Sequence, residues 1–241
     1  MAIKEQEVLF STLELNRSDG LNSLNQVLIS LGFDEYTESN GMWSEHLVLF
    51  AAIAVSDYKV CKILEIGTFC GQTTLILSKL FPSAKLTTYD LPLKNIRNKK
   101  IYEYAFSRKV QDETNFLELR NTNLSQIVDL EFKEKNSLSL TIENGAFDLI
   151  WVDGAHGYPI VCADIINSFR LLNENGIMIC DDVYFRTHKN DSEYTSTASY
   201  ETLLALKEAS LAQVNFVQKR LGLQFNFPKN KKKFLGVCKK L

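Results

Sequence analysis

The chain has 241 residues, with 27 Lys and Arg against 29 Asp and Glu, so its formal net charge is −2. That length suits one α/β domain or two small ones, and it suffices for a substantial hydrophobic core. Apolar residues make up 45% and charged residues 23% of the chain, which excludes a disordered or low-complexity protein. The balanced charge gives no support to a nucleic-acid-binding surface spread over the whole protein.

The sequence also predicts a cytoplasmic protein without membrane partners. Acidic residues interrupt the first twenty positions, where a secretion signal needs an unbroken apolar core. The longest apolar run, residues 47–55, is too short to cross a bilayer. The five cysteines are odd in number and contain no Cys-x-x-Cys pair, so we expect reduced thiols rather than a disulfide framework or a zinc site.

Apolar residues at helical spacing dominate the first part of the chain. They predict helices within residues 5–31 and over 44–55, with Ser44 as the N-cap of the second segment. We expect residues 1–58 to form a helical extension that packs on the core, and residues 59–241 to form the main domain. The apolar face of the extension is a candidate homodimer interface.

From residue 62 onward, strand-like runs alternate with helical stretches. Strands are expected at 62–66, 85–89, 115–119, 147–152 and 176–180, and helices at 72–80, 95–110, 162–172 and 200–211. Two late runs, around Phe216 and at 234–238, are expected to pair as an antiparallel hairpin. This alternation predicts a doubly wound, Rossmann-like α/β fold with a mostly parallel, seven-stranded sheet.

A glycine loop follows the first predicted strand, where residues 64–73 read LEIGTFCGQT. Gly67 and Gly71 permit a tight turn and let a ligand approach the backbone. Their spacing differs from the Gly-x-Gly-x-x-Gly dinucleotide fingerprint, which counts against a nicotinamide or flavin dehydrogenase. Asp90 closes the second strand, where an acidic side chain accepts hydrogen bonds from ribose hydroxyls. Taken alone, such a glycine turn is more often only a turn.

The combination of Glu65-x-Gly67-x-x-x-Gly71 with an acid closing the next strand resembles class I S-adenosylmethionine-dependent methyltransferases. The loop is particularly similar to that of catechol O-methyltransferase and its relatives. The resemblance implies S-adenosyl-L-methionine as cofactor, with its carboxylate at Thr73 and its adenine near Asn123, placed just past the third strand. The cofactor-binding residues implied are Glu65, Gly67, Thr68, Gly71, Thr73, Asp90, Asn123 and Asp153.

Acidic residues also follow the fourth and fifth predicted strands: Asp153 after one, and Asp181 with Asp182 after the other. Adjacent parallel strands lie about 4.8 Å apart, so these carboxylates are expected to converge on one cation. Oxygen ligands favour Mg²⁺, with Mn²⁺ or Ca²⁺ as alternatives. In the competing interpretation, Asp181 and Asp182 cap the next turn and remain solvated.

His156 follows Asp153 by three positions, and imidazole removes protons near neutral pH. A lone histidine in a glycine-rich turn is more often a surface or hydrogen-bonding residue, but the neighbouring acids favour a catalytic base. Together with His156, the carboxylates of Asp153, Asp181 and Asp182 resemble the metal-and-base site of metal-dependent O-methyltransferases. The Asp-Gly-x-His form is more similar to the macrolide-sugar and small-molecule enzymes than to the catechol type, which has a lysine at the position of His156.

The resemblance implies divalent-cation-assisted O-methylation of a small hydroxylated molecule: a sugar, a nucleotide sugar or a natural-product intermediate. One alternative keeps the cofactor without the metal and methylates the nitrogen of a small amine. Another is a non-catalytic protein that binds adenosylmethionine or a nucleotide. A base beside clustered acids argues against this last alternative, because a binding module needs no base.

Overall fold

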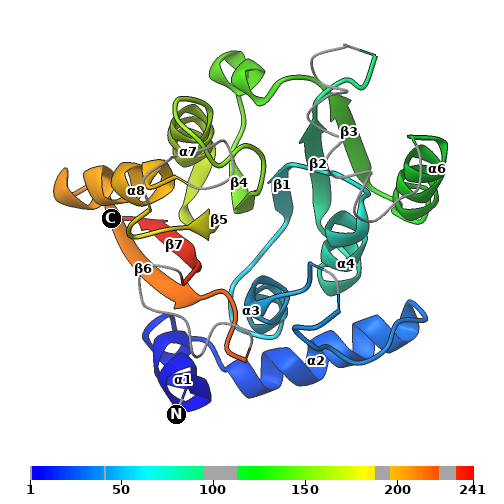
Figure 1. Cartoon of the computed structure of the whole chain (residues 1–241), viewed down its shortest axis with the longest axis horizontal. Coiled ribbons are helices and arrows are strands. Elements are labelled where there is room, and N and C mark those ends of the chain that lie inside the picture. Colours follow the sequence, from blue (N-terminus) through cyan, green and yellow to red (C-terminus); the bar gives the residue numbers. More distant parts are fainter. Residues whose placement is uncertain (1, 41, 95–112, 188–195, 223–231) are drawn as a thin grey trace.

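The computed structural model of the chain describes residues 2–40, 42–94, 113–187, 196–222 and 232–241. A seven-stranded sheet in the order β3-β2-β1-β4-β5-β7-β6 lies at its centre (Figure 1). The strands are β1 (Lys62–Ile66), β2 (Lys85–Asp90), β3 (Leu130–Glu134), β4 (Phe147–Val152), β5 (Leu172–Val183), β6 (Ala212–Gln218) and β7 (Phe234–Lys240). Only β7 runs antiparallel to its neighbours, β5 and β6. The predicted α/β fold with its C-terminal hairpin is confirmed.

Helices cover both faces of the sheet (Figure 1). They are α1 (Ala2–Thr12), α2 (Arg17–Ser30), α3 (Glu45–Ala54), α4 (Gln72–Leu80), α6 (Glu113–Leu124), the 3₁₀ helix η1 (Ser137–Ile142), α7 (Ile160–Leu171) and α8 (Ala198–Glu208). Within the described ranges, no helix is long and apolar enough to cross a membrane.

The central strands are buried on both sides, as alternate residues of β4 illustrate. Leu149 and Trp151 join the core formed with the N-terminal helices and α4. Ile150 and Val152 join the core on the opposite face, beneath α7 and α8. Because successive side chains of a strand point to opposite faces, a continuous apolar run is what such a strand requires.

A buried ion pair joins the N-terminal helices to each other. The Arg17 guanidinium donates from Nε and Nη2 to the Glu45 carboxylate at 2.7 and 2.6 Å. Gln6 donates from Nε2 both to Glu45, at 3.1 Å, and to the carbonyl of Gln218, at 2.8 Å. These contacts connect α1, the start of α2 and the start of α3 to the end of β6.

Two local predictions differ from the structure. The strand expected at residues 115–119 is wrong: this segment lies in α6, where Phe116, Arg120 and Leu124 are buried at helical spacing. The third strand is β3 instead, an edge strand whose alternating charges hid it from an apolar pattern. Ser44 precedes α3 as expected, but its hydroxyl bonds His46 rather than capping the helix. The helix expected at 95–110 lies outside the described residues.

We expect Glu45→Ala to lower the free energy of unfolding by about 3–5 kcal/mol, because it leaves the Arg17 charge buried without its partner. Urea unfolding measures the change. The matched control is Glu174→Ala: Glu174 is 82% exposed and pairs with Lys240 at 3.5 Å. Its loss is expected to cost less than about 1 kcal/mol. Equal effects of the two substitutions would contradict a structural role for the buried pair.

Candidate active site

The glycine loop between β1 and α4 lies directly against the loop that follows β4. Gly67 has a φ of +103°, and a Cβ at this position would lie 2.2 Å from the carbonyl oxygen of Asp153. The Asp153 amide donates to the carbonyl of Ile66 at 2.8 Å, which holds the two loops together. Only glycine permits this approach, so the cofactor loop and the loop carrying Asp153 and His156 form one unit.

The start of α4 has the properties of an anion site. Gly71 is its N-cap residue, with a φ of +72° and no side-chain hydrogen bond to the first turn. The first amide groups of a helix have no partner within the helix and attract a carboxylate. Thr73 lies in this first turn, where the sequence predicts the carboxylate of the cofactor.

Glu65 lies beneath the loop and is fully buried. Its Oε2 accepts hydrogen bonds from Thr74 at 2.5 Å and Thr88 at 2.6 Å, and Thr88 in turn contacts the Thr68 hydroxyl at 2.6 Å. Oε1 has no partner in the described part of the chain. Burial raises the pKa of Glu65 to about 7. A buried acceptor without a donor fits a site completed by a positively charged ligand group.

Asp90 and Asn123 also hold the glycine loop in place. Asp90 accepts from the amides of Phe69, at 2.7 Å, and Leu91, at 2.9 Å. Asn123 donates from Nδ2 to the carbonyl of Cys70 at 2.8 Å. Asn123 therefore lies by the cofactor loop, but at the end of α6 and before β3, not past the third strand as predicted. The sequence also missed Arg120, whose guanidinium is 3.9 Å from Asp90.

The ends of β4 and β5 bring the predicted acids and base together. Ligand atoms of Asp153, His156 and Asp181 all lie within 4.8 Å of one another. The His156 Nε2 is 3.7 Å from the Asp153 Oδ1. In a regular strand, Asp181 and Asp182 would point to opposite faces. The β5 register shifts between Cys180 and Val183, and Asp182 has a φ of +48°, so both side chains serve the same site.

Two lysines that the sequence analysis missed contact these acids. The Lys219 Nζ lies 2.5 Å from the Asp181 Oδ2 and 2.6 Å from the Asp182 Oδ1. The Lys233 Nζ lies 2.6 Å from the other oxygen of Asp182. The lysines flank the paired strand ends of β6 and β7, where Gln218 is opposite Phe234. In the sequence, each lysine borders an apolar run, and Lys233 also ends the basic run at 229–233.

Burial and charge set the protonation states of the cluster. Burial lowers the pKa of His156 below its ordinary value, against the opposing effect of Asp182 and Asp181. The imidazole is therefore neutral near pH 7. Burial raises the pKa of Asp153, and the adjacent Asp181 raises it further. Burial alone would raise the pKa of Asp182, but Lys219 and Lys233 hold it below the usual range.

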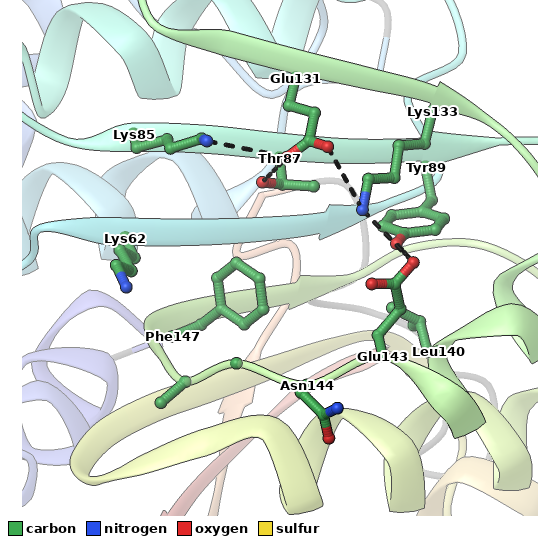
Figure 2. Close-up of a pocket in the computed structure, with 12 residues that line it drawn as sticks. Lys62, Lys85, Thr87, Tyr89, Glu131, Lys133, Leu140, Glu143, Asn144 and Phe147 are labelled. Atoms are coloured by element: carbon green, nitrogen blue, oxygen red, sulfur yellow. Dashed lines mark hydrogen bonds and ion pairs between the residues drawn. The ribbon is translucent and has the colours of Figure 1, made fainter.

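A separate hollow lies between β1–β3 and the segment that joins η1 to β4 (Figure 2). Several of its polar side chains contact one another: Lys133 lies 3.4 Å from Glu131 and from Glu143, and Tyr89 donates to Glu143 at 3.0 Å. Lys62 and Lys85 line it at the amino ends of their strands. Ligands of open α/β sheets bind beyond the carboxyl ends, so this hollow is not where the cofactor is expected.

Comparisons with known proteins agree with this geometry. Residues 64–183 match the family described as "Methyltransferase domain". The fold is similar to that of the O-methyltransferase TomG from Streptomyces achromogenes, solved with S-adenosylmethionine (15% identity, TM-score 0.55, covering 97% of this chain and 95% of that one). It is also similar to the Podospora anserina methyltransferase PaMTH1 bound to S-adenosylhomocysteine (18% identity, TM-score 0.52, covering 92% and 88%). No match was found among curated protein sequences.

We expect Gly67→Ala to abolish S-adenosylhomocysteine binding. An alanine in the left-handed conformation costs about 1–2 kcal/mol, and we expect Gly67→Ala to lower the unfolding free energy by more than this. The reason is the collision with the Asp153 carbonyl. Gly32→Ala is the control, because Gly32 also has a positive φ, +77°, but nothing lies within 4 Å of its added Cβ. Calorimetric titration and urea unfolding measure both effects. Similar losses in the two variants would exclude the close approach as the cause.

The Glu65 pKa predicts a pH-dependent stability of the free protein. Its folded value of about 7 exceeds the reference value of 4.5, so the folded state holds an extra proton between these pH values. The contribution of Glu65 to stability is therefore greatest at low pH and falls, by about 3 kcal/mol, as pH rises through this window. The measurement is the difference in unfolding free energy between wild type and Glu65→Gln from pH 4 to 8. A difference that does not vary with pH would contradict the assignment.

Proposed function

Through residues 64–183 this chain belongs to the methyltransferase-domain family and is an S-adenosylmethionine-dependent methyltransferase, and on that basis we propose that it methylates a hydroxyl group of a small molecule. The observation that carries the proposal is the neutral imidazole of His156 beside Asp153, on the loop that contacts the glycine turn. The acceptors we propose are a sugar, a nucleotide sugar or a natural-product intermediate.

The described residues around the glycine loop suit this cofactor. S-adenosyl-L-methionine supplies, when bound, a methyl group on a positively charged sulfur. The uncapped start of α4 at Gly71 and Thr73 binds its carboxylate, and the unpartnered oxygen of Glu65 receives positive charge from its amino acid end. Asp90 accepts the amides of Phe69 and Leu91, and because a carboxylate oxygen accepts more than one hydrogen bond, we assign it the ribose hydroxyls as well. Thr68 and Asn123 hold the loop in shape.

His156 accepts the proton of the acceptor hydroxyl. Burial keeps the imidazole unprotonated at neutral pH, so that a ring nitrogen has a free lone pair. The negative charges of Asp182 and Asp181 stabilise the imidazolium that forms. Binding holds the hydroxyl between this base and the methyl donor. The reactants then need not meet in solution, which lowers the entropic cost of reaching the transition state.

The divalent cation expected from the sequence fits this site poorly. One oxygen of Asp181 and both oxygens of Asp182 contact lysine ammonium groups. Asp153, His156 and Asp181 each offer a ligand atom within 4.8 Å of the other two, and the Asp181 Oδ1 has no hydrogen-bond partner among the described residues. A cation bound there would lie close to the buried Lys219, so no step proposed for this enzyme passes through a metal.

A metal-independent N-methyltransferase of a small amine is the second candidate. It is favoured by the same lysine contacts, because a neutral amine attacks the methyl group without a cation to lower its pKa. A screen that offers sugars, phenols and small amines in parallel, with release of S-adenosylhomocysteine as the readout, separates the two. Turnover of amines alone would overturn the O-methylation proposal.

We expect His156→Ala to lower kcat by about 10²–10⁴-fold, the contribution typical of a general base. Its affinity for S-adenosylhomocysteine is expected to remain unchanged, because no contact of the glycine loop is removed. Tyr158→Phe is the control, since Tyr158 lies two residues further on and is 80% exposed. Wild-type turnover by His156→Ala would exclude His156 as the base.

A further inference from the structure

We propose that Lys219 is the resident cation of this active site: its ammonium group takes the place expected for a divalent metal ion and holds the acceptor oxygen. The inference rests on the proposed methyl transfer and identifies the charge that assists it. Its starting point is the position of the Lys219 Nζ, between the Asp181 Oδ2 at 2.5 Å and the Asp182 Oδ1 at 2.6 Å.

The donor count of Lys219 leaves room for a substrate. An ammonium group has three N–H donors and no acceptor. The hydrogen bonds found within the described ranges use two of them, both on carboxylates. Lys219 is only 8% exposed. The acids that it contacts, Asp181 and Asp182, are also the acids that act on His156. Its third donor is the group we assign to the acceptor hydroxyl.

The backbone holds Lys219 firmly in this position. Its amide donates to the carbonyl of Lys233 at 3.0 Å, across the β6–β7 hairpin. Its carbonyl accepts from the amide of Glu45 at 3.0 Å, and the Glu45 side chain belongs to the buried ion pair with Arg17. A metal ion would have to displace a lysine anchored on both sides, or bind beside its positive charge.

The charge balance supports the same conclusion. Asp153, Asp181 and Asp182 bring up to three negative charges, and Lys219 with Lys233 brings two positive ones. The cluster is thus close to neutral without any ion. Adding a divalent cation would make it positive and place like charges together in a buried site, where the repulsion is screened little.

In the reaction, Lys219 stabilises the negative charge that develops on the acceptor oxygen. The hydroxyl proton passes to His156, and the oxygen forms its new bond to the methyl carbon. The carbon–sulfur bond breaks at the same time, and its electron pair returns to sulfur to leave a neutral thioether. A donor aimed at the developing charge is worth most where water is excluded.

Replacing Lys219 should turn the enzyme into a metal-dependent one. Lys219→Ala exposes the oxygens of Asp181 and Asp182, which then bind Mn²⁺ or Mg²⁺ through oxygen ligands. In EDTA, we expect its turnover to fall about 10²–10³-fold, in the range measured for the loss of one such donor. Adding Mn²⁺ or Mg²⁺ is expected to raise the turnover of this variant at least tenfold above its value in EDTA. Lys240→Ala, on β7 but paired with the exposed Glu174, is the matched control and should behave as wild type.

The decisive measurement is a metal titration that needs neither cofactor nor acceptor. Wild-type protein is titrated with Mn²⁺ and followed by electron paramagnetic resonance, in parallel with Lys219→Ala and the isosteric Lys219→Met. We expect no binding by wild type up to 1 mM, on the order of the weakest Ca²⁺ sites in proteins, and tighter binding by either variant that folds. We also expect wild-type turnover to be the same in EDTA and in Mg²⁺.

Micromolar Mn²⁺ binding by wild type, or turnover that EDTA abolishes and Mg²⁺ restores, would overturn the assignment of Lys219. Failure of the proposed function looks different: S-adenosylhomocysteine would not bind, or no hydroxylated acceptor would be methylated. The metal titration reports on Lys219 in either case, because it requires neither cofactor nor acceptor.

Discussion

The contact between Gly67 and the Asp153 carbonyl is the constraint on which the site depends. It exists because β1 and β4 are adjacent parallel strands whose carboxyl ends meet at one edge of the sheet. In the reaction we propose, one loop binds the cofactor and the other carries the base, so the close approach of the loops sets how far the base lies from the cofactor. A larger residue at position 67 would separate the two loops and with them the two halves of the reaction.

Charge in this site is balanced by the chain itself. Three carboxylates gather at the ends of β4 and β5, and two lysines from the β6–β7 hairpin approach them from the neighbouring strands. Buried charges persist only when they are paired and hydrogen-bonded. The bulge after Cys180 makes this pairing possible, because it turns two consecutive aspartates toward the same lysine.

The N-terminal helices take part in this arrangement. Glu45 joins α1, α2 and α3 through its side chain, while its amide holds the carbonyl of Lys219. Glu45 thereby connects the N-terminal helices to Lys219. Much of its apolar surface is used in the core beneath β1 and β4, where Phe10, Leu24 and Leu28 are buried.

Local sequence determined the glycine loop, the acids that close the strands and the alternation of strands with helices. These features depend on backbone freedom, on periodic burial and on the rule that parallel strands end at one edge, so the sequence also predicted that Asp153, His156 and Asp181 would meet. It failed at residues 115–119, because a short apolar run suits a strand and a helix equally. Only the tertiary structure revealed Lys219 and Lys233, which lie 38 and 51 positions from Asp181 and Asp182. The contacts of these lysines with the aspartates depend on the register of the β6–β7 hairpin and on the bulge in β5. Neither feature can be recognised from a local sequence pattern.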